Sequence, residues 1–171
     1  MAEAKMKASS VSGLETPRFV DGKALLIAGL RRSYAPGTMD GIAAQWQEFV
    51  PHIVKIAGQI GYTTYGVGWQ GYDGKSVEYL TGVEVSGFKG VPNKFTVVSL
   101  PAMKYAVFPH REHVMKLRDT IDAIFFKWLP QSGYEAGGDV KDTPAFFERY
   151  SEEFNPQTGM GGMEVWVPLK S

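Results

Sequence analysis

The chain has 171 residues, 44% of them hydrophobic and 21% charged, which is enough apolar sequence to build the core of one ordinary domain. Its 18 basic and 18 acidic residues balance without a basic block, so direct binding of nucleic acid is not expected. The absence of cysteine excludes disulfides, zinc–thiolate sites and a cysteine nucleophile, and it fits a cytoplasmic location.

The N-terminal segment, residues 1–16, is small and polar and predicts a flexible tail ahead of a single domain over 17–171. It lacks the apolar core of a signal peptide, and no later stretch approaches the ~20 apolar residues of a membrane span. We therefore expect no membrane association. So short a segment leaves no room for a DNA-binding domain, and a role in transcription would need a separate partner.

The first two predicted elements are a strand and a helix. Residues 22–34 form a short apolar run that fits a largely buried strand. From 39 to 59 apolar residues recur at three- and four-residue steps, which predicts an amphipathic helix. Pro51 falls inside this pattern and should kink the helix or mark a break in it.

Two strands follow. Residues 62–70 predict a strand that carries Gly66 and Gly68 on one face, where the missing side chains allow another group to approach closely. A turn at 71–76 then leads into a second strand over 77–87, whose side chains alternate in part between apolar and polar.

The same order begins again in the second half. Residues 95–110 predict a strand, and a clean apolar stripe over 113–128 predicts a helix. Pro130 and Gly133 are stop signals for that helix. Residues 145–150 then predict the next strand.

A last strand over 163–169 completes the order strand–helix–strand–strand for the second time. The two repeats cover about 19–90 and about 95–170. Such units pair into an α+β fold with one antiparallel sheet and two long helices packed on it. We expect pseudo-twofold symmetry between the repeats and a ligand cleft where they meet.

One strand raises a question about function. In "PAFFERYSEEF" (144–154), alternation places Phe146, Glu148 and Tyr150 on one face and Phe147 and Arg149 on the other. The first interpretation is a solvated face with Phe147 in the core. The second is an aromatic-lined site with one negative charge at its base.

The second half resembles the GyrI-like effector-binding family, which also supplies the drug-sensing domain of AraC- and MerR-type multidrug regulators. The resemblance lies in "YAVFPHREHVMKLRDTIDAIFFKWLPQSGYE", "FERYSEEFNP" and "MEVWVPLK", and more loosely in "GVGWQ" and "YLTGVEV" of the first half. It extends from about Phe19 to Lys170. One departure is Glu112, which stands where the family usually has a glycine two residues after His110.

The resemblance implies an aromatic pocket whose acidic residue, in the penultimate strand, meets small lipophilic and cationic ligands. The matching position here is Glu148. A carboxylate among rings attracts flat cations without fixed hydrogen-bond geometry, so binding is expected to be promiscuous. Trp128 lies on the apolar stripe of its helix, where a core role is the more common one. The candidate ligand-binding residues are Glu148, Phe146, Tyr150, Tyr65, Trp69 and Trp128.

Three functions remain open at this point. The first choice is a stand-alone binding protein for such ligands, used for sensing or sequestration. The resemblance also implies a hydrolase of strained cyclopropane-containing toxins, in which Glu148 would be catalytic with Tyr65 or Tyr150. The third is a protein-interaction module, as the gyrase-inhibitor name of the family suggests. The sequence names neither the natural ligand nor the oligomeric state, and it indicates no cofactor.

A metal site was also considered. His110, Glu112 and His113 form "HREH", but His110 ends a predicted strand and His113 starts a predicted helix. The third histidine, His52, is distant in sequence. Capping of the helix start and surface exposure explain these side chains better than a metal does, so we predict no metal.

Overall fold

A computed structural model describes residues 13–70, 75–138 and 142–171. Most of the predicted turn at 71–76 and most of the predicted tail lie outside these described residues. The described strands form one sheet of eight, in the order β1-β6-β8-β7-β3-β4-β2-β5, and all neighbours are antiparallel. The strands are β1 (Arg18–Asp21), β2 (Leu25–Tyr34), β3 (Gln59–Gln70), β4 (Val77–Val85), β5 (Thr96–Leu100), β6 (Lys104–His110), β7 (Phe146–Tyr150) and β8 (Met163–Pro168).

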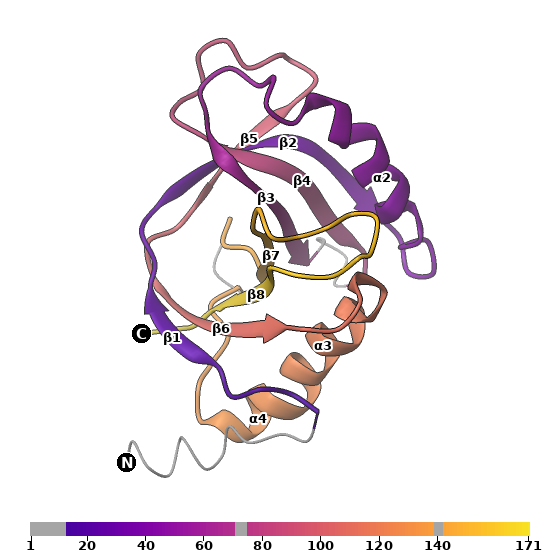
Figure 1. Ribbon diagram of the computed structural model, residues 1–171. Helices are drawn as coiled ribbons and strands as arrows, with labels where there is room; N and C mark the ends of the chain where they lie inside the picture. The colour runs from indigo at the N-terminus through magenta and orange to yellow at the C-terminus, as the bar shows by residue number, and fades with distance from the viewer. Residues whose placement is uncertain (1–12, 71–74, 139–141) are drawn as a thin grey trace.

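The helices accompany the two halves of this sheet. In the first half, α2 (Gly41–Phe49) is followed by a 3-10 turn, η1 (Val50–His52). In the second half, the 3-10 turn η2 (Val114–Lys116) leads into α3 (Leu117–Ala123), a π-helical turn η3 (Ile124–Trp128) and α4 (Leu129–Ser132). Figure 1 shows a strongly curved sheet with α2 beside β2 and β4, and α3 and α4 at the opposite end near β6. The α+β fold with two long helices is therefore confirmed.

The core has three parts on two faces of the sheet. One cluster packs α3 and η3 against β6 and β8, and another packs Phe49 of α2 against β2 and β4. Both lie on the same face, because Val83 and Tyr150 pair in register with Thr64 of β3 from either side. The third cluster, which contains Tyr65, fills the other face. Both helices therefore cover the face that carries Glu148.

The expected element order occurs twice, as β2-α2-β3-β4 and as β6-α3-β7-β8. In the sheet, β3 and β7 pair directly, so the two halves meet along this junction. The strand β1 was not predicted; it adds to the sheet edge beside β6. The pseudo-twofold symmetry and the cleft between the halves stay predictions.

The first predicted helix was too long. The α-helix begins at Gly41 and ends at Phe49, and Pro51 lies in the 3-10 turn that follows. Proline has no N–H and blocks an α-helical path, so the apolar stripe beyond it belongs to another element. The chain is already extended in β3 from Gln59.

The predicted strand over 95–110 is in fact two strands, β5 and β6, separated by a turn that begins at Pro101. The second helix, by contrast, continues past its predicted end at Trp128 to Ser132. Pro130 is tolerated because it lies in the first turn of α4, where no N–H is needed. Gly133 does end the helix, with a left-handed φ of 77°.

No helix in the described part of the chain is long and apolar enough to cross a membrane.

Candidate functional site

Glu148 is the buried acid of the sheet face that lies under the helices. It sits in the middle of β7, pairs with Gly66 of β3 and Val165 of β8, and is 7% exposed. Phe146 and Tyr150 share its face, since side chains alternate along a strand. Phe147 lies in the core cluster of the opposite face. A carboxyl group buried at this depth must find hydrogen-bond donors inside the protein.

Two phenols supply those donors. Tyr79 Oη donates to Glu148 Oε1 at 2.5 Å, and Tyr150 Oη donates to the same oxygen at 2.8 Å. The indole Nε1 of Trp46, on α2, donates to Tyr79 Oη at 3.1 Å. The chain of hydrogen bonds therefore joins α2, β4 and β7 across the junction of the two halves.

Glycines of β3 make room for this cluster. A Cβ atom at Gly66 would lie 2.0 Å from Tyr79 Oη and 2.5 Å from Glu148 Oε1. A Cβ atom at Gly68 would lie 2.6 Å from the ring of Phe146. Any larger side chain would push the phenol, the carboxyl or the ring away. The two glycines on one face of this strand thus permit the close approach that their spacing suggested.

A buried glutamine fixes the helix that carries Trp46. The Gln45 side chain is 0% exposed; its amide donates to the carbonyl oxygens of Leu30 at 2.8 Å and Tyr79 at 3.1 Å. It accepts a hydrogen bond of 2.5 Å from Tyr34 Oη. Because these bonds hold α2 on β2 and β4, the neighbouring Trp46 is held beside Tyr79.

Aromatic rings surround the acid. Trp46 meets Tyr150 edge to face with ring centroids 5.3 Å apart, and Tyr150 meets Phe154 at 5.1 Å. Phe146 meets Phe125 of the π-helical turn at 6.3 Å. We call Glu148, Tyr79, Tyr150, Trp46 and Phe146 the acid–aromatic cluster.

Burial changes how the acid ionises. Desolvation raises the pKa of Glu148 to about 7, although the hydrogen bonds from Tyr79 and Tyr150 favour the ionised form and act against that rise. Desolvation and the neighbouring carboxylate raise the pKa values of Tyr79 and Tyr150 well above the ordinary value of a phenol. Near neutral pH the acid is therefore divided between its neutral and charged forms, and both phenols keep their protons.

The structure brings some of the candidate residues together and separates others. Phe146, Glu148 and Tyr150 form one group. Tyr65 and Trp69 lie in the core cluster of the opposite sheet face, because they occupy the alternate positions of β3. Trp128 is 0% exposed in the cluster under α3, where it stacks on Tyr134 and meets Phe108 edge to face.

Sequence reasoning missed Tyr79 and Trp46 as site residues. Tyr79 is 2% exposed and Trp46 is half-buried, and both were taken only as parts of apolar patterns. Tyr79 reaches the site because it pairs in register with Gly68, which lacks a side chain, and this register is a property of the folded sheet. No sequence pattern placed Trp46 beside it, since that contact depends on how α2 crosses the sheet.

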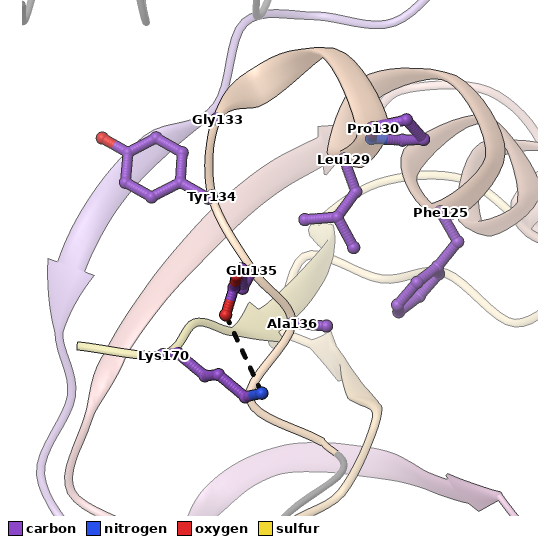
Figure 2. Close-up of a pocket in the computed structure, with 8 residues that line it drawn as sticks. All are labelled: Phe125, Leu129, Pro130, Gly133, Tyr134, Glu135, Ala136 and Lys170. Atoms are coloured by element: carbon purple, nitrogen blue, oxygen red, sulfur yellow. Dashed lines mark ion pairs between the residues drawn. The ribbon is translucent and has the colours of Figure 1, made fainter.

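Neither of two hollows on the described surface is lined by Glu148. The larger has a volume of about 680 Å³ and lies beside α4; Figure 2 shows its lining side chains. The smaller, of about 110 Å³, is lined by His110, Glu112 and Thr120, among others. The carboxyl of Glu148 is instead enclosed by the side chains of the acid–aromatic cluster.

The "HREH" residues serve the local structure. One ring nitrogen of His110, Nε2, lies 2.9 Å from the carbonyl oxygen of His113, and the other, Nδ1, lies 2.8 Å from Thr120 Oγ1. His113 caps the start of the second helix, since its Nδ1 accepts from the N–H of Met115 at 3.0 Å. Glu112 is exposed and lines the smaller hollow with His110 and Thr120. Within the described residues, no group of three acidic or histidine side chains is arranged to hold a metal ion.

Comparisons with known proteins agree on the fold. The sequence model of the GyrI-like small molecule binding domain matches residues 15–170. The transcriptional regulator BrlR of Pseudomonas aeruginosa is 29% identical over 155 residues, which are 89% of this chain and 54% of BrlR. The chain thus spans about half the length of the curated relative that it matches.

Solved structures show the same architecture. SAV2435 bound to tetraphenylphosphonium has a TM-score of 0.73 at 22% identity, over 92% of this chain and 95% of that one. A putative transcription regulation protein from Staphylococcus aureus MU50 has a TM-score of 0.68 at 22% identity, over 93% and 100%. The EcmrR C-terminal domain has a TM-score of 0.60 at 12% identity, over 91% and 97%. At these identities the likeness shows the fold alone.

Proposed function

Because the chain belongs to the GyrI-like small molecule binding domain family, we propose that its ligands are lipophilic, aromatic cations whose charge is received by Glu148. The observation that carries this proposal is a single carboxyl group, 7% exposed, enclosed by aromatic side chains and hydrogen-bonded by Tyr79 and Tyr150. The role is that of a sensor or a sequestering protein. A part in transcription, as in BrlR, would involve a partner or a further domain.

The electrostatics of the cluster favour a cation over a neutral ligand. Water is replaced around Glu148 by hydrocarbon rings, so the ionised carboxylate lacks its usual solvation. A positive charge placed beside it restores that lost stabilisation. Each aromatic face in contact with the cation adds ~0.5–2 kcal/mol.

The geometry of the cluster favours binding of many different cations over selection of one. Both hydrogen bonds to Glu148 Oε1 come from the protein, and a diffuse cation such as a phosphonium has no N–H that must be matched. Affinity then depends on charge and on ring contact, which many ligands share. SAV2435, which has this fold, was solved with tetraphenylphosphonium, a cation enclosed by phenyl rings.

Binding also requires the cluster to open. Trp46 and Phe146 occupy the space beside the acid, and the half-buried Trp46 is the ring that joins the two helix-covered clusters. An aromatic ligand can replace the ring contacts that Trp46 and Phe146 make with Tyr150 and Phe125. The cost of opening is therefore offset for aromatic ligands and not for small hydrated cations.

Titration of tetraphenylphosphonium against the parent chain and Glu148→Gln tests the proposal. Loss of a charged interaction should weaken binding by about 1.5–3 kcal/mol, or about 10- to 150-fold in Kd. Glu84→Gln is the matched control, because it makes the same charge change at a half-buried strand position in register with Ile27, on the opposite face. Equal affinity of parent and Glu148→Gln would reject the role of Glu148.

Hydrolysis is a second candidate, favoured by one observation. A carboxyl group with a pKa of about 7 is suited to general acid–base catalysis near neutral pH, and Tyr150 and Tyr79 contact it directly. An enzyme would convert many equivalents of a strained, cyclopropane-containing substrate, whereas a binding protein would leave the substrate chemically unchanged. Product formation by a small molar fraction of protein decides between the two.

A further inference from the structure

The larger hollow lies next to the acid–aromatic cluster but is not part of it. It is lined by Phe125, Leu129, Pro130, Tyr134, Ala136 and Lys170, among others. It is a shallow depression, largely open to solvent, with a volume of about 680 Å³. In Figure 2, Phe125, Leu129 and the methyl of Ala136 converge on one side of the hollow.

Phe125 connects the hollow with the acid–aromatic cluster. Its ring lines the hollow and also lies 6.3 Å from the ring of Phe146. Phe146 is two residues before Glu148 on the same strand face, so the two Cα atoms are separated by about 7 Å. Phe146 therefore lies between Glu148 and the Phe125 ring that lines the hollow.

The backbone that carries Phe125 is irregular. Ile124–Trp128 forms a π-helical turn inside an otherwise helical segment, and such turns occur frequently at functional sites. Trp128 of this turn is fully buried and anchors it, whereas Phe125 is only half-buried. The turn thus holds Phe125 at the boundary between the core and the hollow.

The far side of the hollow is polar. Lys170 Nζ lies 3.8 Å from Glu135 Oε2, and the two side chains are 41% and 76% exposed. A pair so exposed contributes little to stability. Its opposite charges give this side no preference for a second cation, while Phe125, Leu129 and Ala136 offer an apolar surface.

We propose that this hollow binds the apolar tail of an amphipathic cation whose charged head is at Glu148. The inference rests on the proposed function and deepens it, because it names ligands that carry one cationic centre and one long apolar substituent. The argument for this occupant is continuity: Phe125 lines the hollow and contacts Phe146 of the cluster, and the charged residues Glu135 and Lys170 that line the hollow pair with each other.

A pair of phosphonium ions tests the inference. Methyltriphenylphosphonium carries the cationic head alone, and dodecyltriphenylphosphonium adds a long tail to the same head. In the parent chain we expect the dodecyl compound to bind more tightly, with Kd lower by about 4-fold for each CH₂ that is buried. Titrations are followed by tryptophan fluorescence below the concentration at which the dodecyl compound aggregates.

Two variants narrow the hollow from different sides. Pro130→Trp and Ala136→Leu should each remove about 10-fold or more of the dodecyl affinity and leave methyl binding within about twofold. Phe126→Trp is the matched control for Pro130→Trp: Phe126 is 77% exposed on the same helical segment and does not line the hollow. Equal losses for both compounds in both narrowing variants, or no loss in either, would overturn the inference.

Glu148→Gln separates this inference from the proposed function. It should weaken both compounds by the same factor and keep their affinity ratio. If it leaves methyltriphenylphosphonium unaffected, the role of Glu148 fails, while the narrowing variants still report on the hollow. If Glu148→Gln instead abolishes the advantage of the dodecyl tail, head and tail sites are not separate and the inference fails.

Discussion

Replacing Glu148 by glutamine should change how the stability of the protein depends on pH, with no ligand present. The carboxyl group is enclosed by rings and has a pKa of about 7, against an ordinary value of 4.5. Below about pH 4.5 the acid is neutral in both the folded and the unfolded chain, so its ionisation costs nothing. As the pH rises, the unfolded chain loses the proton first, and the free energy of unfolding falls until the folded acid also ionises near pH 7.

The difference of about 2.5 pKa units corresponds to roughly 3 kcal/mol of stability lost between about pH 4.5 and 7, with no further loss above that range. Glutamine occupies the same volume and does not titrate. Subtracting the free energies of unfolding of parent and Glu148→Gln at each pH cancels the contribution of every other group. Urea unfolding at about pH 5 and pH 8 provides these values. Parallel pH curves for the two proteins would refute the burial of an ionisable acid at this position.

Three further outcomes follow from the same cluster. Tetraphenylphosphonium should bind about 30-fold more weakly at about pH 5.5 than at pH 8, because the cation must displace the proton of a group with a pKa of about 7; a pH-independent Kd measured by calorimetry would contradict this. Tyr79→Phe removes a hydrogen bond that favours the carboxylate, so the midpoint of that binding curve should move to higher pH, and an unchanged midpoint would argue against the contact. Gly66→Ala places a Cβ atom 2.0 Å from Tyr79 Oη and should lower stability by about 1–3 kcal/mol; thermal unfolding at the same melting temperature as the parent would show that the cluster is looser than described.

Alternation along β7 and β3 predicts which of their side chains share a face. It does not predict which residues of other elements contact those side chains. Alternation places Phe146, Glu148 and Tyr150 together, since side-chain direction follows from strand geometry alone. By the same parity, Gly66 and Tyr65 point to opposite faces. If the glycines make room for Glu148, Tyr65 belongs on the other side, and the structure places it there.

The contact between Tyr79 and Glu148 depends on tertiary packing, and the sequence pattern predicted neither this contact nor the end of the first helix. Tyr79 reaches Glu148 only because β4 pairs with β3 in the register that sets Tyr79 opposite Gly68. The periodicity of residues 39–59 predicted one helix, but Pro51 ends it and the later apolar residues belong to a turn and to β3. Hydrophobic periodicity indicates which residues are buried, but it does not show whether they belong to a helix, a turn or a strand.

Under the proposed function, the closed cluster around Glu148 also determines which ligands can open it. In the free protein the two phenols and the surrounding rings already satisfy the carboxyl group, and part of the population near neutral pH is uncharged. A ligand must therefore stabilise the open, ionised form by more than the closed form gains from its own ring contacts. Its apparent affinity is its affinity for the open form multiplied by the fraction of the protein that is open. A small hydrated cation offers charge but no replacement for the ring contacts of Trp46, and a neutral aromatic offers rings but no positive charge to compensate the buried carboxylate. Only a ligand with both a positive charge and aromatic rings compensates both the ionised carboxylate and the lost ring contacts. Selection for aromatic cations therefore follows from the closed state and needs no preformed cavity beside Glu148.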